Sequence, residues 1–336
     1  ADYRRQLALL LEPRQRLRRW LAPRGLTLVP GSTLSLGDSS RFERSNPTNP
    51  YHSYIERTYG SRVVTASVHI NLGLDAMEPL FAGLRLLRCE AALLLALSAS
   101  SPFLDGRATG AHSQRWLQFP LTPAQVPLFR DHDHYVAWME QQLLAGTMRN
   151  VRHLWTSVRP NGEDRPRDLN RLEIRICDLV ADPELLLAIT AWTELRLHQL
   201  LQDPQRHDPL RASQLDAERL ASLADANDQR AARASLDAEL LDWRDGEPIE
   251  ARRWLADSLE AMAPFASELG LLRQLAPLDQ VLAPGPEGGN QAMRWLNRYR
   301  AGESIVAILS EDIRVLAARE LALAAGLATD IATPLG

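Results

Sequence analysis

A group of charged side chains between Arg149 and Asp178 has the types and spacing of a phosphate or metal site. Residues 169–177 alternate with a period of two between charged and apolar side chains, which is typical of a half-buried strand. One face of this strand carries Arg171, Glu173 and Arg175. A carboxylate can bind a metal ion, and fixed guanidinium groups can hold phosphate oxygens. The pattern therefore predicts the floor of a polar site.

The segment just upstream supplies a partner strand. His153 to Pro160 also alternates and sends the side chains of Trp155, Ser157 and Arg159 to one face. The polar loop 161–168 joins the two segments, so we expect a β-hairpin that brings Arg159 near Glu173 and Arg175.

A third alternating segment, residues 62–74 (RVVTASVHINLGL), carries two further polar candidates. Its apolar side chains fall on one face, whereas His69 and Asn71 point together on the other, about 7 Å apart by strand geometry. This spacing suits one ligand or one metal-phosphate group. An ordinary polar sheet face gives the same pattern, so the motif leaves both interpretations open.

A long apolar segment, Met77 to Ser100, predicts a helix that packs flat against the sheet. The loop after it contains Gly and carries Arg107, His112 and Arg115. Loops at the end of a rigid helix often hold substrate groups, although many polar loops only face solvent. We count Arg107 and Arg115 as candidate substrate-binding residues.

Two other groups could suggest chemistry, but they favour structural roles. The motif DHDHY places His132 and His134 between acidic residues, but positions i and i+2 diverge on a helix, so we predict an acidic helix start. Cys89 and Cys177 have neither a zinc spacing nor a disulfide framework. We interpret Cys177 as a small buried residue, because no adjacent His base is evident.

Composition limits the classes of function. The 336 residues are 45% hydrophobic with a net charge of -4, which gives no general reason to expect a nucleic acid or an anionic membrane as partner. All 38 basic residues are Arg, so a lysine Schiff base and a P-loop are excluded. The longest apolar run, Ala91 to Leu97, is too short for a membrane span. No signal peptide is visible, and we expect a cytoplasmic protein that is a monomer or a homodimer.

Other patterns predict the remaining elements. Residues 26–36 are a strand candidate, SNPTNPYH is predicted to be a turn-rich loop, and Pro183 to Leu201 is predicted to be a helix. Further helices are predicted over residues 214–233, 249–269 and 290–323, with a turn at WRDGEP. We expect an α+β chain with a sheet-and-helix core in residues 1–205 and a helical region, 206–336, packed on the same domain.

Several motifs in order resemble one family. RLEIRICDLVADPELLLAITA resembles the R-x-E-x-R strand, Asp-Pro turn and helix of the glutamine synthetase-like carboxylate-amine ligases. The motifs PGSTLSLGDS, VVTASVHINLG, LLALSASSPFLDGRATGAHSQRW, GTMRNVRHLW and SVRPNGEDRPRDLNRLEIRICDL are similar to those of cyanobacterial-type glutamate-cysteine ligases. The similarity covers residues 26–200 well and the helical tail more loosely.

The resemblance implies a fold, a reaction and a set of site residues. The fold is a curved antiparallel sheet with helices packed behind it. The reaction uses ATP and Mg2+ to activate the γ-carboxylate of glutamate as an acyl phosphate, which the amine of cysteine then attacks, as the first step toward glutathione. By motif, Glu173 and His69 approach the metal, and Arg159, Arg175 and Arg171 contact phosphates. The resemblance leaves Arg107, Arg115 and Asn71 for the substrates.

The sequence departs from the family in one respect. Relatives begin with strands that supply further Glu ligands in a G-[IF]-E-x-E pattern, and the first 60 residues contain no replacement. One carboxylate is a poor Mg2+ site, because hard cations prefer several oxygen ligands. We therefore expect an N-terminally truncated form of an active ligase. The alternatives are a relative that joins glutamate to another amine, and a noncatalytic binding protein that keeps the fold.

Overall fold

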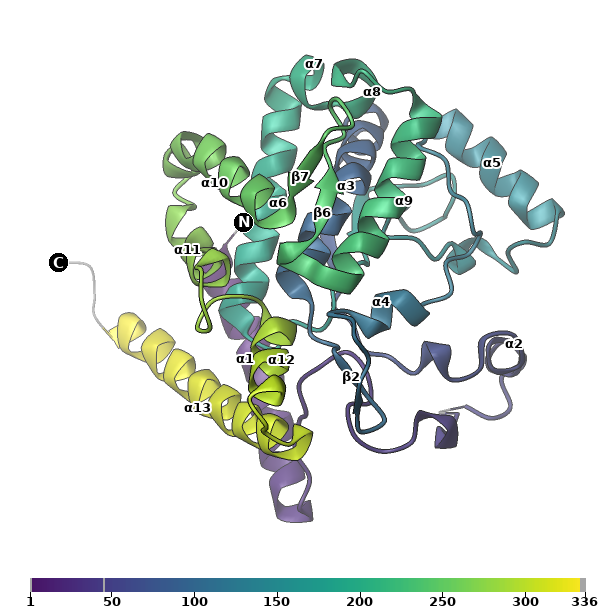
Figure 1. Ribbon diagram of the computed structural model, residues 1–336. Coiled ribbons are helices and arrows are strands. Elements are labelled where there is room, and N and C mark those ends of the chain that lie inside the picture. Colours follow the sequence, from purple (N-terminus) through teal and green to yellow (C-terminus); the bar gives the residue numbers. More distant parts are fainter. Residues whose placement is uncertain (1, 45, 333–336) are drawn as a thin grey trace.

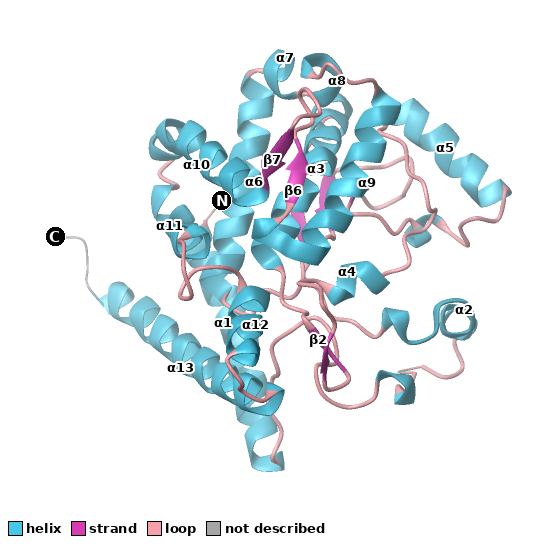
Figure 2. Cartoon of the chain, in the orientation of Figure 1, coloured by secondary structure: helices cyan, strands magenta, loops and turns pink. Residues whose placement is uncertain are grey.

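The computed structural model describes residues 2–44 and 46–332 (Figure 1). Helices dominate, and the strands are short (Figure 2). The α-helices are α1 (Tyr3–Leu21), α2 (Pro50–Tyr59), α3 (Met77–Ser98), α4 (Gln114–Gln118), α5 (His132–Leu144), α6 (Pro183–Gln202), α7 (Pro204–His207), α8 (Pro209–Ala212), α9 (Ala217–Ala234), α10 (Ala251–Glu268), α11 (Leu272–Leu282), α12 (Gln291–Arg300) and α13 (Ile305–Ala332). The strands are β1 (Ile70–Gly73), β2 (Phe103–Leu104), β3 (Arg107–Ala108), β4 (Val158–Asn161), β5 (Arg171–Ile174), β6 (Glu239–Leu241) and β7 (Pro248–Glu250).

An antiparallel sheet of three strands, in the order β1-β5-β4, carries the predicted polar residues. Its register places Asn71 of β1 and Arg159 of β4 on either side of Glu173 of β5. Directly opposed residues share a face of a sheet, so these three residues form one row. The predicted hairpin between residues 153–160 and 169–177 is therefore confirmed, although its paired strands are shorter than the alternation indicated.

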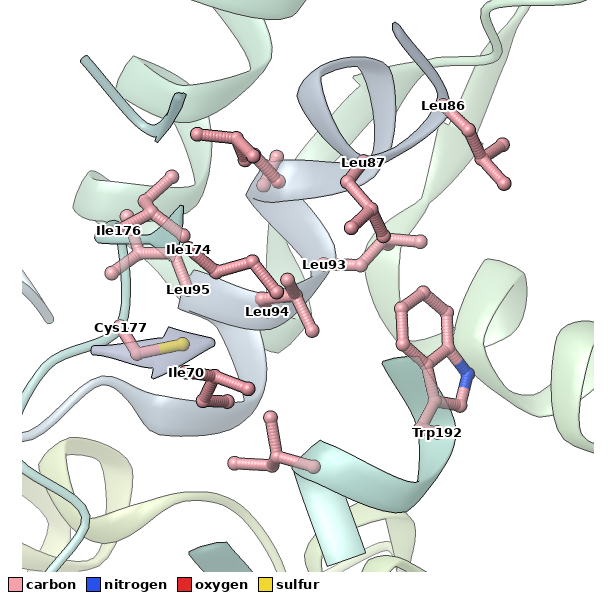
Figure 3. Packing of buried hydrophobic residues seen from close by; sticks show 14 of the residues in the cluster. Ile70, Leu86, Leu87, Leu93, Leu94, Leu95, Ile174, Ile176, Cys177 and Trp192 are labelled. Atoms are coloured by element: carbon pink, nitrogen blue, oxygen red, sulfur yellow. The ribbon is translucent and has the colours of Figure 1, made fainter. Parts of the chain in front are cut away.

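The helix α3 forms the support behind the sheet. It is buried from Leu80 to Ser98 because its sequence is apolar on nearly every side, and it packs against β4 and β5 as well as α6 and α9. Gly83 allows this close approach, since a Cβ there would lie 2.9 Å from Leu197 and 3.0 Å from Leu172. Figure 3 shows the resulting core of isoleucine and leucine side chains from the sheet and α3. The predicted helix is confirmed.

The two cysteines belong to this interior. Cys89 and Cys177 are both free and buried. Burial raises the pKa of the Cys177 thiol to about 12, and it also raises the pKa of Cys89. A thiol that stays protonated is a poor nucleophile. The interpretation of Cys177 as a small buried residue is confirmed.

The segment 26–36 is not a strand, contrary to the prediction. Only Thr33 forms an isolated bridge, with Thr65. Pro30 has no N–H to donate to a ladder, and Gly31 adopts a φ of 105°, which strand residues do not use. The apolar residues of this segment therefore follow an irregular path.

The predicted loop SNPTNPYH is also only partly correct. Its second Asn-Pro pair begins α2, where the Asn49 side chain accepts a hydrogen bond of 2.9 Å from the Tyr51 N–H. Pro50 occupies the first helical turn, where its missing N–H costs nothing. The same capping logic holds at α5: Asp131 accepts from the His134 N–H, which confirms the predicted helix start.

The second half of the chain packs directly on the first. The predicted helices α6, α9 and α10 are present, with α9 along α3. The single helix predicted over residues 290–323 is instead broken after Arg300 into α12 and α13, and α13 lies beside α1 and α12 (Figure 1). The predicted turn at WRDGEP is present and closes the hairpin β6–β7. The sequence patterns predicted neither the two strands of this hairpin nor the helix α11. Within the described ranges, no helix has both the length and the apolar character that crossing a membrane requires.

Two acidic residues of α9 are expected to respond in opposite ways to the same substitution. Asp228 is 3% exposed, and among the described residues its Oδ1 atom has no hydrogen-bond partner. Burial and the nearby Asp225 carboxylate raise the pKa of Asp228 well above its ordinary value of 3.8. The folded protein therefore retains a proton that the unfolded chain releases, so stability is lost as pH rises above about 4. We expect Asp228→Asn to raise the free energy of unfolding at pH 8 by about 1–3 kcal/mol, and by less near pH 4.

Urea unfolding at the two pH values measures this effect, and Asp225→Asn is the matched control. Asp225 binds the Arg88 guanidinium at 2.5 Å, and Arg88 is itself buried. Its removal leaves a buried cation without a partner, so Asp225→Asn is expected to destabilise the protein at pH 8. If Asp228→Asn gave no stabilisation at pH 8, Asp228 would not be the protonated, poorly compensated acid described here.

Candidate active site

Glu173 is the centre of a charged cluster on the sheet. Its Oε2 atom accepts hydrogen bonds from Arg159 Nε at 2.7 Å and Asn161 Nδ2 at 2.9 Å. Its Oε1 atom lies 2.9 Å from His69 Nδ1 and 3.3 Å from Arg175 Nη1. Three strands thus contribute to one cluster, which we call the Glu173 cluster: His69, Arg159, Asn161, Glu173 and Arg175.

The electrostatics of the Glu173 cluster favour anions. Burial alone would raise the pKa of Glu173, but hydrogen bonds from His69 and Arg159 and the charges of Arg159 and Arg175 hold it well below its ordinary value. Burial and the charge of Arg159 lower the pKa of Arg175 to about 10, so its guanidinium stays cationic at neutral pH. Two guanidinium charges against one carboxylate leave a net positive charge, which suits phosphate oxygens.

A third guanidinium, which the sequence reasoning missed, adds to this charge. Arg165, in the loop between β4 and β5, is close enough for Arg159 to lower its pKa and for Glu173 to raise it, while burial is the largest effect and lowers it. Its Nη1 atom is buried and has no hydrogen-bond partner among the described residues. The run DRPRD was a visible signal, but a loop has no periodicity that would show where its side chains point.

Arg159 is held by the backbone on its far side. Its Nη1 atom donates to the carbonyl oxygens of Arg152 at 2.9 Å and Leu154 at 2.8 Å. Because Arg159 is only 6% exposed and bonds to Glu173 through Nε, its position is fixed. It therefore orients the Glu173 carboxylate as well as contributing charge.

A group of aromatic side chains lies next to the backbone that holds Arg159. The sequence did not predict this group. The ring of His153 lies 5.8–6.2 Å from the rings of Tyr51, Tyr54 and Tyr59 of α2. The Tyr59 hydroxyl is 2.9 Å from His153 Nε2. Burial raises the pKa of Tyr51, whereas the charges of Arg159 and Arg175 lower it, so Tyr51 lies beside the Glu173 cluster. The helix α2 thus forms a wall next to the cluster.

The structure separates the two arginines that were predicted to bind substrate. Arg107 lies exposed in β3, outside the Glu173 cluster. Arg115 is 2% exposed and lies beneath the end of β5, where it donates to the carbonyl oxygens of Arg175 at 2.7 Å and Ile176 at 2.9 Å. The Arg115 guanidinium is buried, donates to two backbone oxygens and pairs with Asp178, so Arg115 acts here as a support for the strand that carries Arg175.

Asp178 completes that support. Its carboxylate accepts hydrogen bonds from the Ser100 N–H and from the hydroxyls of Ser101 and Ser113, and it lies 3.5 Å from Arg115 Nη1. These contacts fasten the segment after α3 to the end of β5. Since Asp178 is fully buried, the loop that carries Arg107 is fixed relative to the Glu173 cluster.

The two remaining predicted residues lie at the border of the cluster. Asn71 is opposite Glu173 in the register, but its side chain is exposed to solvent. Arg171 is half-buried, and its Nη1 atom donates to Asn170 at 2.8 Å. Among the described residues, neither side chain forms a hydrogen bond or ion pair with Glu173, so both border the row of charges without being part of its bonding.

The residues of the Glu173 cluster do not fit Mg2+ as they are arranged. No three His, Cys, Asp or Glu side chains in the described ranges gather to hold a metal ion. Both oxygens of Glu173 already accept from cationic or amide donors, which a metal ion would have to displace. Hard divalent cations prefer several oxygen ligands, and this cluster supplies one carboxylate.

Comparison with solved structures places the fold. The structure of glutamate-cysteine ligase from Francisella tularensis in complex with AMP matches 82% of this chain and 71% of that protein, with a TM-score of 0.53 and 14% sequence identity. The α+β fold is therefore of the glutamine synthetase-like class, with helices behind small antiparallel sheets.

Sequence comparison defines the family. The glutamate-cysteine ligase family 2 model matches residues 1–312. A Corynebacterium efficiens protein named "Putative glutamate-cysteine ligase 2-1" is 30% identical over 272 residues, which are 79% of this chain and 68% of that relative. A Micrococcus luteus protein named "Putative glutamate-cysteine ligase 2" is 30% identical over 275 residues, covering 79% of this chain and 64% of the relative. The chain belongs to glutamate-cysteine ligase family 2, and it spans about two thirds of the length of these two relatives.

Proposed function

We propose that the protein is an ATP-dependent ligase that joins the γ-carboxylate of glutamate to the amine of cysteine. Its family and the net positive Glu173 cluster support the proposal, and the cluster is the observation that carries it. Transfer of a phosphoryl group to a carboxylate brings two anions together, so catalysis depends on fixed positive charge around the transferring group.

The proposed reaction has two steps. A γ-carboxylate oxygen of glutamate attacks the terminal phosphorus of ATP, and ADP leaves. The amine of cysteine, once deprotonated, then attacks the carbonyl carbon of the acyl phosphate, and inorganic phosphate leaves with the oxygen. Both steps develop charge on phosphoryl oxygens, which Arg175 and Arg159 are positioned to stabilise.

We assign the other residues by their position around the cluster. Glu173 keeps the guanidinium groups apart and aligned, and His69, which is one third exposed, is the member of the cluster most open to a reactant. Arg171 is assigned to the phosphates and Asn71 to a substrate, since both border the row of charges. Arg107 has an exposed guanidinium to offer the α-carboxylate of glutamate, whereas Arg115 does not.

ATP-dependent phosphoryl transfer generally uses Mg2+, which would neutralise charge on the phosphates, and the proposed reaction is expected to require it. The cluster residues described above do not form a site for the ion by themselves. We therefore assign no step of the reaction to a metal bound by Glu173.

The test is phosphate release from ATP, measured with purified protein and Mg2+ while glutamate and cysteine are added separately and together. The expected result is release that needs both amino acids, with one γ-glutamylcysteine formed for each phosphate. Dependence on glutamate with a different amine from a panel would revise the second substrate. ATP binding without any turnover would favour a noncatalytic relative and would overturn the proposed activity.

A further inference from the structure

A second polar cavity lies among helices on another part of the molecule. It has a volume of about 350 Å³ and is bounded by α6, α11, α12, α13 and the end of α3, and none of its lining residues belongs to the Glu173 cluster. In Figure 1, α12 and α13 lie at the lower left, far along the chain from the strands of the sheet. A cavity of this volume is large enough for one small metabolite.

One end of the cavity presents two hydrogen-bond donors, Arg294 and Gln291. Arg294 of α12 donates from Nη1 to the Gly289 carbonyl at 2.5 Å, but no described carboxylate oxygen lies within 4.0 Å of its guanidinium. Beside it, the Nε2 atom of Gln291 is buried without a hydrogen-bond partner among the described residues. The carboxylates of Asp312, Asp182 and Glu287 act on Arg294 only from beyond ion-pair distance. A partly buried cation without a direct ion pair and a buried donor without an acceptor point to an anionic ligand group.

The opposite charge is also present. Asp312 of α13 accepts from Trp295 Nε1 at 2.6 Å through Oδ2, while its Oδ1 atom has only a distant ion pair, 3.9 Å from Arg298. Burial raises the pKa of Asp312, although the hydrogen bond from Trp295 and the charges of Arg294 and Arg298 lower it. Asp312 therefore has room for a cationic partner.

The other acidic groups of the cavity argue against a polyanion such as ATP. Asp182, at the start of α6, is 2.8 Å from Arg319, and Glu287 lies exposed at the rim. Three carboxylates around one unpaired guanidinium repel a phosphate chain, but they accept a ligand that has one negative and one positive group. The remaining wall is aliphatic and includes Leu185, Val281 and Leu316.

We propose that this cavity binds a free α-amino acid with an aliphatic side chain. Its carboxylate meets Arg294 and Gln291, its ammonium group meets Asp312, and its side chain packs against the aliphatic wall. The proposal is independent of the ligase activity, because it uses none of the residues assigned to that reaction.

Calorimetric titration of the intact protein with L-leucine tests the proposal. Two probes separate the contributions: 4-methylpentanoate lacks the ammonium group, and 3-methylbutylamine lacks the carboxylate. We expect leucine to bind with a Kd below about 1 mM and both probes to bind at least about tenfold more weakly, since each charged hydrogen bond lost is worth about that much. No binding of leucine up to about 10 mM, or equal binding of the three compounds, would overturn the proposal.

Variants locate the site. Arg294→Gln should weaken leucine binding by about tenfold or more, whereas Arg300→Gln, an exposed Arg on the same helix, should leave it unchanged. Asp312→Asn keeps an acceptor for Trp295 Nε1 and should weaken binding of leucine but not of 4-methylpentanoate. Circular dichroism and thermal melting check that each variant folds. Unchanged leucine affinity in both folded variants, Arg294→Gln and Asp312→Asn, would place the bound amino acid elsewhere.

Discussion

Glu173→Gln is expected to abolish ligase turnover and also to destabilise the folded protein. The Glu173 carboxylate accepts from two arginines, one histidine and one asparagine, and it is 6% exposed. Glutamine offers one oxygen in place of two and turns an N–H donor toward other donors. With the negative charge removed, Arg159 and Arg175 repel each other in a partly dry site. We expect activity to fall by about 10²-fold to 10³-fold or more and the free energy of unfolding to fall by about 3–5 kcal/mol.

The packing around Glu173 thus makes this substitution a structural change as well as a catalytic one. Because the pKa of Glu173 is held below its ordinary value of 4.5, its stabilising contribution is present above that pH and is lost as the pH falls toward the lowered pKa. The stability difference between wild type and Glu173→Gln should thus be full at pH 7 and should shrink below about pH 4.5.

Glu163→Gln is the matched control, since Glu163 lies exposed in the loop of the same hairpin. It should change stability by no more than about 0.5 kcal/mol and leave phosphate release unchanged. Urea unfolding at pH 7 and pH 4 and the phosphate-release assay make the comparison. Near-normal activity in Glu173→Gln would show that the carboxylate is not needed to align the guanidinium groups.

Within the candidate site, periodicity predicted the central hairpin and little beyond it. A strict alternation over residues 169–177 fixed which side chains share a face with Glu173, because a strand has only two faces. The same rule gave Arg159 its place opposite Glu173. It did not give the strand order β1-β5-β4, which brings His69 to the other oxygen of the carboxylate, since alternation carries no information about neighbours far along the chain.

Residues in loops and between helices could not be placed from the sequence. Asn161 joins the cluster from the end of β4, Arg165 lies near the cluster in the hairpin loop, and Arg115 turns inward from the short helix α4. Each of these side chains is polar and looks solvent-facing in the sequence. Their positions depend on tertiary contacts, as does the cavity at Arg294, which is assembled from five helices. The predicted strand at 26–36 was wrong for a local reason and not a tertiary one. Pro30 and the backbone conformation of Gly31 do not allow a continuous strand, whatever the alternation of the side chains.

Arg115→Gln and Arg107→Gln are expected to have different effects, although both residues were predicted to bind glutamate. The Arg115 guanidinium is buried, donates to the carbonyl oxygens of Arg175 and Ile176, and lies beside Asp178. Glutamine is too short to reproduce these contacts and leaves the Asp178 carboxylate without its counterion. We expect Arg115→Gln to lower the free energy of unfolding by about 3–5 kcal/mol. It should also lower kcat, because β5 and Arg175 lose their support.

Arg107→Gln removes an exposed guanidinium, so stability should change by no more than about 0.5 kcal/mol, while the KM for glutamate should rise by about tenfold or more. Urea unfolding and steady-state kinetics at varied glutamate distinguish the two roles. A raised KM for glutamate with unchanged stability in Arg115→Gln would return that residue to the substrate site. Arg115→Lys keeps the positive charge beside Asp178, but a lysine amine lacks the planar fork that reaches two carbonyl oxygens at once. We therefore expect Arg115→Lys to restore the lost stability only in part. The stability that Arg115→Lys restores measures the contribution of the charge beside Asp178. The stability that it does not restore measures the contribution of the paired hydrogen bonds to the carbonyl oxygens after β5.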